Sequence, residues 1–101
     1  MAGRVYQDRA LWLDQDQHLL RAAGASILLT RTQWRLLTAL LARPGELVSK
    51  EELYQSGWPG PLFEADLHLV SWHMSRLRRK ISPARIQTIR GFGYRYVTPE
   101  E

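Results

Sequence analysis

The segment from Leu67 to Ile81 carries the pattern that most restricts how this chain can fold. Apolar residues recur in it at spacings of three, four, three and four positions, namely at Leu67, Val70, Met74, Leu77 and Ile81. At 3.6 residues per turn, this spacing places all five side chains on one face of an α-helix. We therefore expect a helix with a buried stripe from about residue 64 to residue 81, because the Ser82-Pro83 pair ends it.

The opposite face of this predicted helix is polar and positively charged. It collects the side chains of His68, Leu69, Trp72, Ser75, Arg76 and Arg79. Arg78 falls nearer the apolar stripe, so its charged group must reach solvent along the aliphatic stem. The stretch SRLRRK, from Ser75 to Lys80, contains no acidic residue. The helix is therefore predicted to present a cationic outer surface.

The stretch IQTIRGFGYRYV, residues 86–97, predicts a β-hairpin shortly after the helix. Strands are expected at 86–90 and 94–97, and Gly91 and Gly93 allow the positive φ angles that a tight reversal needs. Arginines lie on both sides of the glycines, and no acid interrupts the run. A thin cationic ribbon is thus expected next to the cationic helix.

The first 29 residues predict a small antiparallel sheet. Four short apolar-rich segments, RVYQ, ALWLD, HLLR and ASILL, are separated by DRA, DQDQ and AAG. These separators contain residues that favour turns, whereas the segments have the length and composition of short strands. We expect the four segments to pair with one another.

Two further helix starts lie between this sheet and the long helix. Thr30 with Gln33, and Ser49 with Glu52, have the spacing of capping boxes. Apolar residues at helical spacing follow the first cap, and we expect them in the core together with Met74 and Leu77: they include Trp34, Leu37 and Leu41. The ARPGE stretch, residues 42–46, ends this helix because proline and glycine do not continue one.

The predicted order of elements is sheet, helix, helix, loop, long helix and hairpin. With 101 residues the chain has room for one domain, 1–101. We divide it into a sheet at 1–29, a three-helix core at 30–81 and a hairpin at 86–97. The second and third helices resemble a helix-turn-helix with an extended turn, and the hairpin takes the place of a wing. The predicted fold class is therefore α+β, a winged helix-turn-helix.

Composition limits the functions open to this chain. The sequence has no cysteine, which excludes a disulfide framework, a thiol nucleophile and a cysteine-based zinc site. The three histidines lack the spacing of a metal site, and no serine, histidine and acid recur as a catalytic set. We expect no metal, no cofactor and no enzymatic activity. No apolar run approaches the ~20 residues of a membrane span, and no signal peptide is evident, so we expect a cytoplasmic protein.

Charge is distributed unevenly along the chain. Residues 1–66 contain seven Lys/Arg and eight Asp/Glu, a net charge of −1, whereas residues 67–101 contain seven Lys/Arg and two Asp/Glu, a net charge of +5. Concentrated charge of one sign attracts polyanions. A helix fits the major groove of B-DNA, and a slim hairpin can reach phosphates or an adjacent minor groove. The pattern favours double-stranded DNA as the ligand.

Three stretches of the chain resemble a known family. LTRTQWRLLTALLARPGELVSKEELYQSGWPG, HMSRLRRKI and IQTIRGFGYRYV are similar to the effector domain of OmpR/PhoB-type transcriptional regulators. The resemblance spans nearly the whole chain, and SRLRRK combined with TIRGFGYR is its most specific part. It implies a winged helix-turn-helix that binds promoter DNA, commonly as tandem copies, and so as a dimer, on direct repeats. Relatives often touch RNA polymerase through the loop that corresponds to residues 56–66.

The resemblance also implies roles for individual residues. By position, the base-reading face of the family falls on Trp72, Ser75, Arg76 and Arg78. The minor-groove arginine of the family falls on Arg90. Contacts to the DNA backbone fall on Lys50, Trp58, His73, Thr88 and Tyr94, and we expect Arg79, on the same basic face, to make one as well.

Some residues depart from the family pattern. Ser71 stands where an acid is common, Trp72 where a small or β-branched residue is common, and Leu69 where threonine or serine is common. Leu69 and Trp72 leave open an alternative function, a winged-helix module that docks a protein. Trp72 can equally be a partly covered structural residue or a contact to a thymine methyl group. Binding of single-stranded nucleic acid through exposed aromatic residues is a third alternative.

Overall fold

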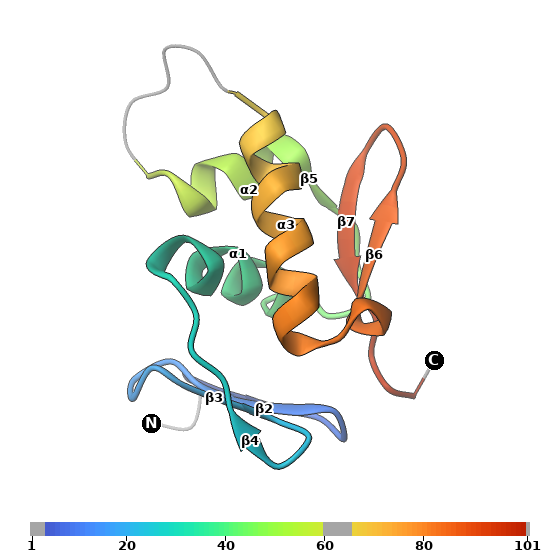
Figure 1. Ribbon diagram of the computed structural model, residues 1–101. Helices are drawn as coiled ribbons and strands as arrows, with labels where there is room; N and C mark the ends of the chain where they lie inside the picture. The colour runs from blue at the N-terminus through green and yellow to red at the C-terminus, as the bar shows by residue number, and fades with distance from the viewer. Residues whose placement is uncertain (1–3, 60–65, 101) are drawn as a thin grey trace.

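The computed structural model describes residues 4–59 and 66–100. An N-terminal sheet lies below a group of three helices, and a C-terminal hairpin stands beside the last helix (Figure 1). The elements in chain order are β1 (Val5–Gln7), β2 (Leu11–Asp14), β3 (Leu19–Ala22), β4 (Ala25–Ser26), α1 (Arg31–Leu41), β5 (Val48–Ser49), α2 (Lys50–Gly57), α3 (His68–Ile81), a 3₁₀ turn (Pro83–Arg85), β6 (Ile86–Ile89) and β7 (Gly93–Tyr96).

The N-terminal sheet is an antiparallel meander with strand order β1-β2-β3-β4. One face is apolar, because Leu11, Leu13 and Leu20 are almost completely buried. The strand expected over ASILL is wrong in its length, since β4 ends at Ser26. The Ile27 amide still donates to the Leu20 carbonyl at 2.8 Å, and the chain then leaves the sheet to reach the start of α1.

Helix α1 begins as the sequence predicts. The Thr30 hydroxyl accepts from the Gln33 amide, and the Gln33 side chain accepts from the Thr30 amide, so the capping box is confirmed. Leu37 and Leu41 are buried, as expected. Trp34 is only partly buried, so its assignment to the core interior is wrong. It packs against the outside of the core, and its ring lies 5.3 Å from that of His18.

Helix α2 begins at a cap that uses one half of the predicted box. The Ser49 hydroxyl accepts from the Glu52 amide at 3.1 Å. The Glu52 carboxylate turns to Arg43 in the loop after α1, and their charged groups are 2.7 Å apart. This ion pair gives Glu52 a role that the local sequence pattern did not indicate.

Helix α3 crosses the front of the molecule in Figure 1. The predicted stripe is confirmed for Val70, Met74, Leu77 and Ile81, which are buried. The helix begins at His68, not at about residue 64; residues 64 and 65 themselves lie outside the described part. Asp66 stands before the helix, and its carboxylate and carbonyl accept from the amides of His68 and Leu69.

The hairpin β6–β7, which we call the wing, reverses at residues 90–92. Gly91 has φ of +84°, as predicted. Gly93 serves a different purpose, because a Cβ on it would lie 2.1 Å from the Val48 carbonyl oxygen of β5. This close approach lets β5 pair with β7 and gives a three-stranded sheet in the order β5-β7-β6.

The core lies where α1, α3 and the two sheets meet, and its largest fully buried side chain is Tyr96 of β7. None of the helices within residues 4–59 and 66–100 combines the length and hydropathy needed to cross a membrane.

Candidate nucleic-acid interface

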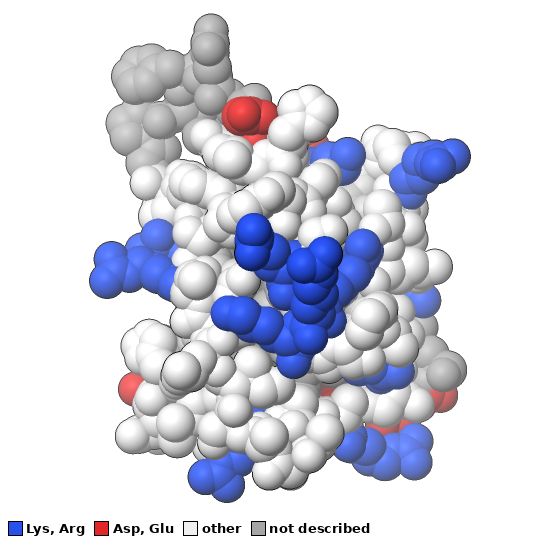
Figure 2. All heavy atoms as spheres, viewed as in Figure 1, with Lys and Arg blue, Asp and Glu red and all other residues white. Residues whose placement is uncertain are grey.

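The outward face of α3 carries most of the predicted base-reading residues. Ser75, Arg76 and Arg79 are exposed, and Trp72 retains 53% of its exposure. Figure 2 shows Lys and Arg side chains gathered over α3, with no acidic residue among them in this view. The structure therefore brings these residues together on one cationic surface, where the field favours a polyanion.

Arg76 and Trp72 form a pair on this surface. They stand one turn apart on α3, and the guanidinium carbon of Arg76 lies 4.0 Å from the centre of the Trp72 ring. This is the geometry of a cation–π contact. The contact restricts the orientations of Arg76 and leaves its charge in place.

Arg78 joins α3 to the wing. Its Nε donates to the Ile86 carbonyl at 3.1 Å, and its Nη2 donates to the Thr88 hydroxyl. Its guanidinium also lies 5.6 Å from the centre of the Tyr94 ring. Two predicted DNA-contacting side chains, Arg78 and Thr88, are thus partners of each other. Their bond holds the helix and the hairpin side by side.

Tyr94 makes a second link between α3 and the wing. It is 3% exposed, and its hydroxyl donates to the Ser71 hydroxyl at 3.1 Å. The serine that stands where relatives often have an acid is therefore the partner of a wing tyrosine. The phenol of Tyr94 is engaged within the protein, although the family resemblance implies a contact to the DNA backbone.

The tip of the wing carries Arg90. It is exposed in the turn beside Gly91, and the neighbouring Phe92 is 64% exposed. Lys50 lies close by in the fold, because its amide donates to the Phe92 carbonyl at 3.3 Å. Lys50 is also the first residue of α2, and its side chain is partly exposed. A cation therefore stands at the tip of the wing and another at its edge.

A row of aromatic rings lies between α2 and α3, on the side of α3 away from the wing. Trp58 is stacked on Tyr54 with ring centres 5.0 Å apart, and it meets the edge of His73 at 5.2 Å. His73 in turn meets Trp72 edge-on at 4.8 Å. Desolvation by burial lowers the pKa of His73, and the nearby Arg76 charge lowers it further. The predicted backbone contacts Trp58 and His73 thus adjoin the base-reading face through Trp72.

Sequence reasoning missed two cations on this side of α3. Arg31 opens α1, and Lys80 lies near the end of α3. Lys80 donates to the Leu28 carbonyl at 2.9 Å and to Gln33 Oε1 at 2.7 Å, and so connects α3 to the start of α1. The SRLRRK run did contain Lys80, but only the fold places it in the same cleft as the first turn of α1.

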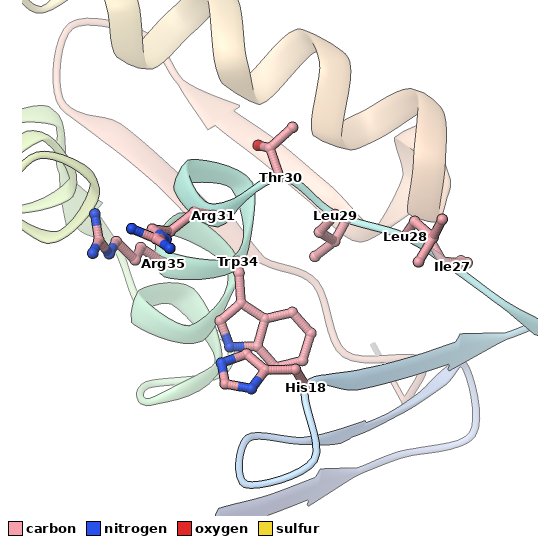
Figure 3. Close-up of a pocket in the computed structure, with 8 residues that line it drawn as sticks. All are labelled: His18, Ile27, Leu28, Leu29, Thr30, Arg31, Trp34 and Arg35. Carbon is pink, nitrogen blue, oxygen red and sulfur yellow. The ribbon is translucent and has the colours of Figure 1, made fainter.

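A hollow of about 430 Å³ lies between α1 and the N-terminal sheet (Figure 3). His18 and Trp34 face each other on its sheet side, and Leu28 beside it is 88% exposed.

Among the described residues, no three His, Asp or Glu side chains are grouped as a metal site would require. The loop expected to touch polymerase, 56–66, lies partly outside the described residues, since 60–65 are not described.

Comparison with known proteins places this chain in a family. The model of a family described as "Transcriptional regulatory protein, C terminal" matches residues 24–96. Transcriptional regulatory protein CseB of Streptomyces coelicolor is 39% identical over 89 residues, which are 84% of this chain and 36% of CseB. The chain spans less than half the length of such curated relatives.

Solved structures show the same fold. The DNA-binding domain of CpxR from E. coli has a TM-score of 0.78 and 32% identity, over 93% of this chain and 96% of that one. The DNA-binding domain of RstA from Klebsiella pneumoniae, solved in complex with the RstA box, has a TM-score of 0.81 and 22% identity, over 93% of this chain and 97% of that one. The chain belongs to the family of C-terminal, OmpR/PhoB-type winged-helix domains of transcriptional regulatory proteins.

Proposed function

We propose that this chain binds double-stranded promoter DNA as the effector domain of a transcriptional regulator. Helix α3 enters the major groove, and the wing lies at the adjacent minor groove. One observation carries the proposal: Arg78 bonds α3 to the wing, so a cationic helix and a cationic hairpin share one face. The groove dimensions of B-DNA suit a helix and a slim hairpin placed in this way.

The residues on this face divide into roles. Phosphate contacts fix the position of the protein, and base contacts give sequence preference. Arg76 and Ser75 are proposed to read bases, and Arg90 to enter the minor groove. Arg79, Lys50, Trp58 and His73 are proposed to contact the backbone. Arg78 uses two of its five N–H donors within the protein, which leaves others to reach a base edge.

Relatives give this proposal independent support. Family members are transcriptional regulatory proteins, and one structural neighbour was solved on its own DNA box. Binding of two copies to direct repeats follows from the same likeness and belongs to the proposal. The alternative of a protein-docking face on Leu69 and Trp72 has less support, because Arg76 covers part of the Trp72 ring and Leu69 is partly buried.

Selection of bound sequences from a random duplex pool tests the proposal, followed by a salt titration of the best duplex. We expect the logarithm of the association constant to fall with the logarithm of salt concentration, by about 0.9 per phosphate contacted. Arg76→Ala should cost about 1–3 kcal/mol and relax one position of the motif. Arg21→Ala, on the N-terminal sheet, is the matched control and should change neither the affinity nor the selected motif. A flat salt response, or an unaltered motif in Arg76→Ala, would contradict the proposal.

A further inference from the structure

A cleft lies between α3 and the first turn of α1. Its volume is about 670 Å³, and its walls include Arg31 and Thr32 from α1 and Trp72, Arg76, Arg79 and Lys80 from α3. Neither the base-reading role of α3 nor the wing accounts for Arg31 and Lys80. The cleft is continuous with the proposed interface, because His73 also lines it.

The cleft is strongly cationic. Four of its lining residues are Lys or Arg, and none is acidic. Lys80 bonds to a carbonyl and to a side-chain amide oxygen, which are uncharged, so its positive charge is not cancelled. The Arg76 guanidinium lies over the indole ring of Trp72, which is uncharged, so the positive charge of Arg76 is not cancelled either. The positive end of the α1 dipole adds to this field, since Arg31 is the first residue of the helix.

The cleft and the wing lie on opposite sides of α3. Arg78 bonds to the wing, whereas Lys80, two residues later, bonds to the start of α1. Two residues correspond to about 200° around a helix, so these two side chains leave α3 in nearly opposite directions. Figure 1 shows the same arrangement, with the wing on one side of α3 and α1 on the other. Arg79, between them in sequence, is exposed.

A helix in the major groove has a phosphate backbone on each side of it. The wing occupies one side. We propose that the α1–α3 cleft binds backbone phosphate on the other side, with Arg31 as a contact and Lys80 holding the two walls together. This inference rests on the proposed function, because it presumes that α3 lies in the groove of a duplex.

Arg31 and Arg35 offer a matched pair for the test. Both are arginines of α1, one turn apart, and both line the hollow of Figure 3, but only Arg31 also lines the cleft. Arg31→Gln and Arg35→Gln each remove one positive charge from the same helix. We expect Arg31→Gln to reduce the salt slope by about 0.9, the value for one phosphate contact, with the selected motif unchanged. Arg35→Gln should keep the parent slope. Equal slopes for the two variants would overturn the inference.

A second measurement uses DNA in which single phosphates are replaced by uncharged methylphosphonates. We expect the unaltered chain to lose affinity at positions on both sides of α3. At one position away from the wing, this loss should disappear in Arg31→Gln and persist in Arg35→Gln. If every penalty persists in Arg31→Gln, the cleft does not bind phosphate. If the unaltered chain shows no salt-dependent duplex binding at all, the proposed function itself is wrong, and the inference fails with it.

Discussion

Trp72 is half exposed, yet its ring carries the guanidinium of Arg76 on one side and the edge of His73 on another. Free arginine side chains lose rotational freedom when they bind. The contact with Trp72 removes part of this freedom before DNA arrives. Trp72 is therefore interpreted as a residue that positions Arg76, and this explains why an aromatic residue is compatible with a reading face.

Replacement of Trp72 tests this role. Trp72→Leu should weaken binding to the best duplex by about 0.5–1 kcal/mol, the strength of an exposed cation–π contact. Trp72→Phe keeps an aromatic ring and should retain most of this binding free energy. The affinities are measured by fluorescence anisotropy in a double-mutant cycle with Arg76→Ala. Effects of Trp72→Leu and Arg76→Ala that simply add would show that the two residues act separately.

At the element scale, a methyl group on Gly93 and one on Gly91 would destabilise the wing for different reasons and by different amounts. Gly93→Ala places a Cβ against the Val48 carbonyl and should separate β5 from β7, at a cost of about 1–3 kcal/mol or more. Gly91→Ala meets open space and only strains a residue with positive φ, at about 1–2 kcal/mol. Urea unfolding of both variants measures the difference. A cost for Gly91→Ala above that for Gly93→Ala would contradict the role assigned to Gly93.

Asp8 ties the N-terminal sheet to β7. Its Oδ2 accepts from the Tyr6 hydroxyl at 2.6 Å and from the Tyr96 hydroxyl at 2.8 Å, and its Oδ1 accepts from the Ala10 and Leu11 amides. Burial raises the pKa of Asp8, but these hydrogen bonds outweigh it, and the pKa falls below its usual value of 3.8. The carboxylate form is therefore the one that the fold favours.

This network makes stability depend on pH in the acid range. A carboxyl group with a lowered pKa contributes stability above its unfolded value, and this contribution is lost as pH falls through the folded pKa. We expect Tyr96→Phe to cost about 1.5–3 kcal/mol near pH 7, because it removes a hydrogen bond to a charged acceptor. The gap in unfolding free energy between the parent and Asp8→Asn should narrow as pH falls below 3.8. A gap that widens on acidification would contradict this account.

Sequence patterns predicted those features of the fold that depend on residues close together in the chain. The Thr30 cap and the α3 stripe follow from spacing within a few turns, and both are present. The early end of β4 and the partial exposure of Trp34 depend on how the sheet meets α1. The partners of Arg78 and Tyr94 lie 10 and 23 residues away in the chain, so spacing does not reveal them. The cations of the outer face of α3 and of the wing tip followed from sequence, whereas the place of Arg31 and Lys80 in one cleft, and the bonds that orient Arg78, required the fold.

At the scale of the whole molecule, one face combines α3, the wing and the α1–α3 cleft. The N-terminal sheet lies away from this face in Figure 1, below the helices. The sheet supports this face. Leucines of the sheet are buried in the core, and Asp8, between β1 and β2, accepts a hydrogen bond from Tyr96 of β7. We therefore predict that the chain is divided into a DNA-contacting half and a supporting half.

Titration of the isotope-labelled chain with its selected duplex, followed by backbone amide chemical shifts, tests this division most directly. We expect the largest shift changes in α3 between Trp72 and Arg79 and in the wing tip around Arg90, with little change in β1 and β2. Changes concentrated in the N-terminal sheet, or changes in α3 without any in the wing, would contradict it.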